Sequence, residues 1–219
     1  MPIQTIIFDF DYTLVDSARG TIDGVNYAFE KMGLPIASDA AVRRAIGLSL
    51  PDILTRLAGD AYVKRVDEFT HLFLQRADET MVALAEFYAE VPQTVKALQG
   101  LGIHLAIVSQ KLRRYIQLIL EKENLLEAFE VIVGGRDAPY KPDPEGLLSA
   151  VAQTGSISEN CLYVGDSVTD AETARRAEIA FVAVLSGVTP RTAFESYDVY
   201  AILEDVSRLL SLESVRRLQ

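Results

Sequence analysis

The sequence predicts an α/β fold in which a doubly wound parallel sheet carries a smaller helical insertion. Short aliphatic runs bounded by polar or glycine residues recur along the chain, and helical patterns separate most of them. One long stretch near the N-terminus contains no convincing strand. Strands that alternate with helices in this way favour a parallel sheet with helices on both of its faces.

Five runs are predicted as buried strands because their apolar character is nearly continuous rather than alternating. They are residues 5–10, 103–109, 130–133, 161–165 and 181–185. Helices are expected at residues 92–101, 112–122, 144–153 and 168–178. Pro92 can open the first of these helices, and Gly100 and Gly102 can end it.

The strand-free stretch is predicted to be a separate helical domain. Four helices fit between Ser17 and about Met81, with Gly33 and Pro35 ending the first and either Ser38 or Asp39 able to cap the next. We therefore expect an α/β core formed by residues 1–15 and 82–219, and a helical cap formed by residues 16–81.

Composition excludes several classes of partner. The chain has 219 residues and a formal net charge of −10, which disfavours nucleic acid and anionic membranes. A phosphorylated ligand would need local cations to offset this charge. The longest apolar run, residues 179–185, is far shorter than the roughly 20 residues of a membrane helix. The single cysteine, Cys161, excludes an internal disulfide, and with an N-terminus lacking a basic signal region it favours the cytoplasm.

Polar side chains follow four of the predicted strands, at the edge of the sheet where ligands bind in open α/β folds. These residues are Asp9 and Asp11 after the first strand, Ser109 at the end of the second, Lys141 in a loop after the third, and Asp166 and Asp170 after the fourth. If the strand ends converge, carboxylates, a hydroxyl and a lysine share one site. Such oxygen ligands suit Mg²⁺, which with Lys141 would supply the positive field that a phosphate needs.

The four segments resemble the motifs of the haloacid dehalogenase superfamily. DFDYTLVDS, beginning at Asp9, resembles the DxDxT motif, and Ser109 fits the second motif. Lys141 in YKPDPEGLL fits the third, and GDSVTD, which contains Asp166 and Asp170, fits the fourth. The resemblance covers almost the whole chain and is nearest to phosphoglycolate-phosphatase-like members. It implies a Rossmann-like core with an inserted helical cap.

The resemblance also implies roles for individual residues. Asp9 is expected to be the nucleophile that forms an aspartyl-phosphate, and Asp11 to protonate the leaving oxygen and later deprotonate the attacking water. Ser109 is expected to donate to a phosphoryl oxygen, and Lys141 to offset the charge on Asp9 and the phosphoryl group. Gln110 replaces the asparagine usual in phosphoglycolate-type members and is expected to be a further substrate contact.

The same resemblance implies a Mg²⁺ site. Its expected ligands are Asp9, the backbone carbonyl of Asp11 and Asp166, with Asp170 in the outer shell.

The expected function is that of a Mg²⁺-dependent phosphatase acting on a small phosphorylated metabolite, with phosphoglycolate as the best single substrate. Inorganic pyrophosphatase, sugar-phosphate mutase and a non-catalytic phosphometabolite-binding protein remain alternatives. Asp11 disfavours the dehalogenase and phosphonate-hydrolase branches, which lack it, and Leu50 stands where a mutase would carry a basic residue. Tyr12 replaces a glycine that most relatives carry, so it could crowd or select the leaving group.

Overall fold

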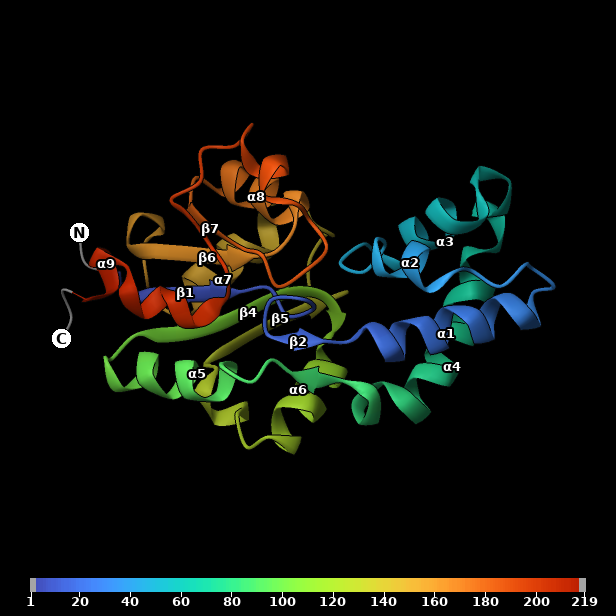
Figure 1. Ribbon diagram of the computed structural model, residues 1–219, viewed down its shortest axis with the longest axis horizontal. Coiled ribbons are helices and arrows are strands. Elements are labelled where there is room, and N and C mark those ends of the chain that lie inside the picture. Colours follow the sequence, from blue (N-terminus) through green and yellow to red (C-terminus); the bar gives the residue numbers. More distant parts are fainter. Residues whose placement is uncertain (1–2, 217–219) are drawn as a thin grey trace. The chain divides into compact units, whose positions relative to one another are not determined.

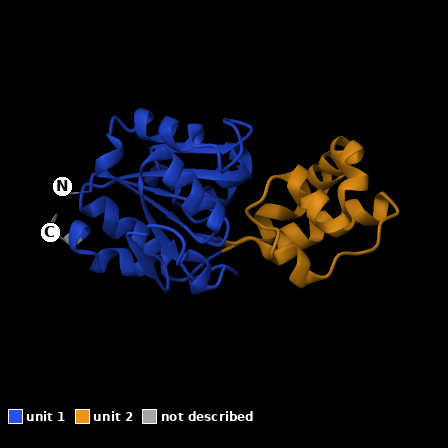
Figure 2. Ribbon diagram, turned by 90° about the horizontal axis from the view of Figure 1, so that it is seen from above, with its two compact units in different colours: residues 1–15, 87–219 blue, residues 16–86 orange. Residues whose placement is uncertain are grey.

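The computed structural model describes residues 3–216 and forms two compact units (Figure 2). Unit 1 comprises Met1–Val15 and Phe87–Gln219, and unit 2 comprises Asp16–Glu86. Unit 2 ends at Glu86 rather than at residue 81, where the sequence placed the boundary, because its last helix, α4 (Val66–Leu84), continues past that point.

Unit 1 contains a six-stranded sheet in the order β5-β4-β1-β6-β7-β8, with every neighbouring pair parallel (Figure 1). The strands are β1 (Thr5–Phe8), β4 (His104–Leu112), β5 (Val131–Gly135), β6 (Cys161–Gly165), β7 (Ala180–Val184) and β8 (Ala201–Leu203). The predicted α/β fold class is confirmed. The sequence analysis missed β8, a half-buried strand of 3 residues that is too short to show a pattern. Two short strands, β2 (Val15–Asp16) and β3 (Glu86–Phe87), form a second sheet.

The strand order places a topological switch at β1. The chain passes from β1 to β4 and β5 on one side, and then to β6, β7 and β8 on the other. Open α/β sheets bind ligands at the carboxyl ends of the strands where the order reverses. The segment that follows Phe8, at the end of β1, is therefore at the expected ligand site.

Helices cover both faces of the sheet (Figure 1). α5 (Val91–Gly100) and α6 (Arg113–Lys122) lie on one face, and α7 (Glu145–Gln153) and α8 (Val168–Ala177) lie on the other. Alternate strand residues point to alternate faces, so Ile7 and Phe181 pack in one buried cluster with Leu147 of α7 and Ala174 of α8. The core thereby fixes the strands whose ends carry the polar residues. A last short helix, α9 (Glu213–Arg216), follows β8.

Unit 2 contains α1 (Ala18–Lys31), α2 (Asp39–Arg43), α3 (Leu50–Ala58) and α4, which are the four helices that the sequence predicted. Ser38 caps α2 by accepting a hydrogen bond from the backbone N of Ala41, as expected. A Cβ on Gly24 of α1 would lie 2.8 Å from the ring of Phe73, so glycine permits the close packing of α1 on α4. Among the helices of residues 3–216, none has the length and apolarity needed to cross a bilayer.

Candidate active site

Three of the predicted acidic residues lie together at the carboxyl ends of β1 and β6. Asp9 follows β1 directly, Asp166 follows β6, and Asp170 lies in the first turn of α8. One carboxylate oxygen of each lies within 4.8 Å of the others, and all three residues are buried. The structure therefore brings together three of the four acidic residues that the sequence placed at this edge of the sheet, and Asp11 is not among them.

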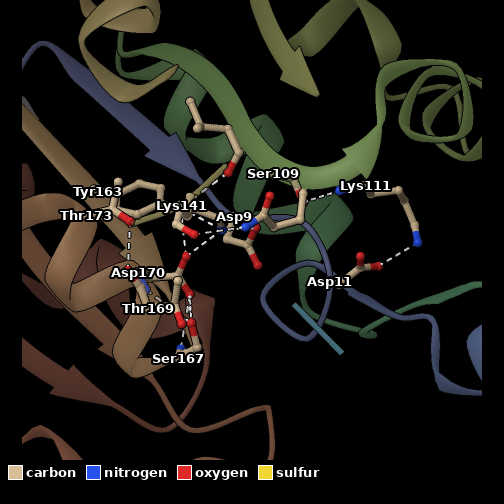
Figure 3. A network of polar contacts seen from close by, with 12 residues as sticks. Asp9, Asp11, Ser109, Lys111, Lys141, Tyr163, Ser167, Thr169, Asp170 and Thr173 are labelled. Carbon is tan, nitrogen blue, oxygen red and sulfur yellow. Dashed lines mark hydrogen bonds and ion pairs between the residues drawn. The ribbon is translucent and has the colours of Figure 1, made fainter. Parts of the chain in front are cut away.

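Lys141 joins this cluster from the loop between β5 and α7. Its Nζ lies 2.8 Å from Oδ1 of Asp9 and 2.6 Å from Oδ1 of Asp170 (Figure 3). It also donates a hydrogen bond of 3.2 Å to the hydroxyl of Tyr163, which lies in β6. Burial alone would lower the pKa of Lys141, but Asp170 and Asp9 outweigh it and hold that pKa well above its usual value. Lys141 is thus a permanent cation beside Asp9.

Asp170 is held by protein donors on both of its oxygens. Oδ2 accepts hydrogen bonds from the backbone N of Ser167 at 3.1 Å and from its Oγ at 2.6 Å. Ser167 Oγ in turn accepts from the backbone N of Asp170, which completes a capping box at the start of α8. Oδ1 accepts from Lys141 and, at 2.8 Å, from Tyr163. Asp170 therefore both stabilises the first turn of α8 and orients the side chain of Lys141.

Three carboxylates lie together in this cluster, and Lys141 balances only one negative charge. Burial raises the pKa of Asp9 to about 7, with Lys141 opposing the rise and Asp170 adding to it. Burial, Asp170 and Asp9 likewise raise the pKa of Asp166 well above its usual value. Both shifts favour the protonated carboxyl groups, and a cation bound at the cluster would favour the ionised ones.

Asp11 lies beside a different lysine. Its Oδ1 is 3.0 Å from Nζ of Lys111, and both side chains are buried. Figure 3 shows this pair on the opposite side of the view from Asp170. Lys111 belongs to β4, which continues to Leu112 instead of ending at Ser109 as predicted. If all four carboxylates are ionised, they exceed the two lysines by two charges, which is the charge of one divalent cation.

Ser109 and Gln110 form part of the wall of the site. Ser109 is buried, and its Oγ accepts a hydrogen bond of 3.4 Å from the backbone N of Lys111. The side-chain amide of Gln110 donates to the backbone oxygen of Lys141 at 3.2 Å. This hydrogen bond connects Gln110 of β4 to the loop that carries Lys141. Its contact with a substrate stays a prediction, as does the hydrogen bond expected from Ser109.

Three residues of the site were missed as functional residues by sequence reasoning. Tyr163 lies in the middle of a buried strand and is typical of a core residue in the sequence. Ser167 is an ordinary helix-capping residue, although its position three residues before Asp170 signals the capping box. Lys111 was noted only as a neighbour of Ser109. The available signal was its position: Lys111 is a basic residue two positions after Ser109, the predicted phosphate contact at the end of a strand.

The turn after β1 has an unusual backbone at Tyr12. Its φ is 62°, in the left-handed region that favours glycine. The backbone N of Tyr12 donates to the oxygen of Val15 at 2.7 Å, and the backbone oxygen of Tyr12 accepts from Ser186 Oγ at 2.6 Å. The phenol ring is buried. The turn therefore holds Tyr12 in a strained conformation immediately after Asp11.

Comparisons with known proteins point to one family. The family of haloacid dehalogenase-like hydrolases matches residues 6–184. The chain is 30% identical over 218 residues to a phosphoglycolate phosphatase of Pseudomonas syringae pv. syringae, covering 94% of this chain and 78% of that protein. It is 32% identical to a phosphoglycolate phosphatase of Aquifex aeolicus, covering 80% of this chain and 81% of that protein. A solved haloacid dehalogenase-like hydrolase from Bacteroides fragilis superposes with a TM-score of 0.91 at 33% identity, covering 94% of this chain and 99% of that one.

Proposed function

This chain belongs to the haloacid dehalogenase-like hydrolases, and on that premise we propose that it is a Mg²⁺-dependent phosphatase that uses Asp9 as its nucleophile. The proposal depends on one observation above all. Asp9 lies at the carboxyl end of β1, at the switch point of the sheet, with Lys141 2.8 Å away and two further carboxylates beside it. Phosphoryl transfer needs little beyond such positioning and charge stabilisation.

In the first step, a carboxylate oxygen of Asp9 forms a bond to phosphorus while the bond from phosphorus to the leaving oxygen breaks. Asp11 gives its proton to that oxygen, so the alcohol departs neutral and Asp9 becomes an aspartyl-phosphate. In the second step, water attacks the same phosphorus and gives a proton to Asp11. The bond between phosphorus and Asp9 breaks, which releases phosphate and restores both aspartates. Lys141 favours the ionised, nucleophilic form of Asp9 throughout.

The donor set fits Mg²⁺. Asp9, Asp166 and the backbone carbonyl of Asp11 would hold the ion through oxygen ligands, which Mg²⁺ prefers. Both oxygens of Asp170 already accept hydrogen bonds, so an outer-shell role suits this residue better than direct ligation. When bound, Mg²⁺ neutralises charge on the carboxylates and on the phosphoryl group. The raised pKa values of Asp9 and Asp166 support this assignment.

The phosphoryl group would be bound by donors from the neighbouring strand ends. The hydroxyl of Ser109 and the ammonium of Lys141 are both buried at this edge of the sheet. Gln110 follows Ser109 in β4, and its side-chain amide donates to the backbone oxygen of Lys141. These groups supply the local hydrogen bonds and positive charge that a phosphate needs in a protein of net charge −10.

Phosphoglycolate is the substrate that we propose first, because relatives at 30% and 32% identity bear the name phosphoglycolate phosphatase. The decisive experiment measures phosphate release by purified protein with Mg²⁺. The substrate panel contains phosphoglycolate, pyrophosphate, sugar phosphates and nucleotides. Asp9→Asn is expected to abolish release, as is EDTA. Asp198→Asn, which changes an exposed aspartate of the same unit, serves as the matched control and is expected to keep full activity.

Each outcome distinguishes the alternatives. Preferred hydrolysis of pyrophosphate would identify a pyrophosphatase, and isomerisation of a sugar phosphate without net phosphate release would identify a mutase. Stabilisation by ligands without turnover would indicate a binding protein. Phosphate release that persists in Asp9→Asn would contradict the proposed nucleophile.

A further inference from the structure

Lys111 is a buried cation that the reaction described above does not use. Its side chain is 6% exposed, and its Nζ lies 3.0 Å from Oδ1 of Asp11, whose side chain is 8% exposed. Two charges withdrawn from water lose much of their hydration, and they recover that energy only by close contact with each other and with further polar groups. Lys111 therefore helps to set the position of the Asp11 carboxylate.

The backbone of β4 is irregular around Lys111. β4 pairs regularly with β5 through Val108, and the register shifts before Leu112. Such an irregularity re-aims the side chains of a strand. A Cβ on Gly135 of β5 would lie 2.2 Å from the backbone oxygen of Gln110, so the irregular path fits only against a glycine. Lys111, which contacts Asp11, therefore lies within an irregular segment of β4.

The two lysines of the site serve different carboxylates. Lys141 contacts Asp9 and Asp170, whereas Lys111 contacts Asp11. The two aspartates of the first motif thus face separate cations although only one residue lies between them. In an in-line displacement, the attacking and leaving oxygens lie on opposite sides of phosphorus. An acid that protonates the leaving oxygen must therefore be held apart from the nucleophile.

We infer that Lys111 is a positioning residue that holds the carboxylate of Asp11 apart from Asp9, where it can reach the leaving oxygen. This inference rests on the proposed phosphatase function. It assigns Lys111 no contact with the substrate. Loss of Lys111 is therefore expected to slow the first step only for substrates whose leaving group needs a proton.

The test compares two substrates whose leaving groups differ in that need. 4-Nitrophenolate is a weak base and departs unaided, whereas the alkoxide released from phosphoglycolate needs the proton of Asp11. We expect Lys111→Met to lower kcat/KM for phosphoglycolate about 100-fold, and for 4-nitrophenyl phosphate less than about threefold. Because kcat/KM reports steps only up to the first irreversible one, later hydrolysis of the aspartyl-phosphate does not affect the comparison.

Two further variants control this measurement. Lys111→Arg keeps the positive charge and is expected to recover most of the loss for phosphoglycolate. Lys96→Met, which changes an exposed lysine on α5, is expected to leave both kcat/KM values unchanged. Equal losses for both substrates, or no loss for either, would overturn the inference and leave the phosphatase proposal standing. If the unmodified protein released no phosphate from either substrate, the proposed function would fail and the inference with it.

Removal of one partner of a buried ion pair can unfold a protein. The effect of Lys111→Met is therefore also measured in a variant that lacks the charge of Asp11. Asp11→Asn removes the charge that Lys111 balances, and circular dichroism verifies that each variant is folded. In the Asp11→Asn background, Lys111→Met is expected to change kcat/KM for phosphoglycolate less than about threefold, because the two residues act as a unit. A further loss of about 100-fold in the double variant would overturn the inference.

Discussion

The phenol oxygen of Tyr163 lies 2.8 Å from Oδ1 of Asp170 and donates a hydrogen bond to it. The same oxygen accepts a hydrogen bond from Lys141. Burial and the neighbouring carboxylate of Asp170 raise the pKa of Tyr163 well above its usual value, so the phenol keeps its proton. A core strand is thereby connected to the lysine beside the nucleophile, and Tyr163 fixes the position of both charged partners.

Tyr163→Phe is expected to weaken this connection without creating a cavity. The ring stays in place, but a buried carboxylate loses one donor, so the free energy of unfolding should fall by about 1–3 kcal/mol. The value of kcat should fall several-fold because Lys141 is less firmly held. Urea unfolding and steady-state kinetics measure the two effects. Tyr200→Phe, at a residue that is 50% exposed, provides the control, and equal behaviour of the two variants would contradict this role of Tyr163.

Because Gly187 has no side chain, the carboxylate of Asp166 can lie directly against it. A Cβ at Gly187 would lie 1.9 Å from Oδ2 of Asp166, so Gly187→Ala must displace that carboxylate. We expect the Mg²⁺ concentration for half-maximal activity to rise about tenfold or more, as when the surroundings of a metal ligand are disturbed. Gly100→Ala is the matched control, because nothing lies within 4 Å of its added Cβ. An unchanged Mg²⁺ requirement in Gly187→Ala would argue against Asp166 as a ligand.

The strand ends that carry Asp9 and Asp166 could be predicted from the sequence. Each acid directly follows an apolar run, and the parallel pairing of β1 with β6 then brings the two ends together. The contact of Lys111 with Asp11 could not be predicted, because the two residues are distant in the sequence and Lys111 lies where the register between β4 and β5 shifts. The contacts of Tyr163 could not be predicted either. A tyrosine in a buried strand is usual in a core, and its polar partners Lys141 and Asp170 belong to other segments of the chain.

The backbone strain at Tyr12 predicts an order of stability between two truncations. Tyr12→Gly and Tyr12→Ala both remove the buried ring, but only alanine keeps a Cβ at a φ of 62°. The left-handed conformation costs about 1 kcal/mol or more for a residue with a Cβ. We therefore expect the glycine variant to have the higher free energy of unfolding by about 1 kcal/mol. Chemical denaturation measures both, and an alanine variant as stable as the glycine variant would contradict a constrained turn.

The raised pKa values of Asp9 and Asp166 predict how pH affects the metal-free protein. The pKa of Asp9 is about 7 in the folded protein, against 3.8 for an unperturbed aspartate. Between these pH values the folded protein binds more protons than the unfolded chain, so its free energy of unfolding should fall as pH rises. Excess Mg²⁺ favours the ionised carboxylates and should reduce this fall.

Urea unfolding from about pH 5 to about pH 7.5 tests this expectation, with EDTA in one series and Mg²⁺ in the other. Asp166→Asn removes one of the two titrating groups, so its metal-free stability should depend less steeply on pH than that of the unmodified protein. All other titratable groups are common to both proteins, so their effects cancel in the comparison. Equal slopes in the two metal-free series would show that Asp166 is ionised across this range without a cation, and the argument for a metal at the cluster would lose its electrostatic basis.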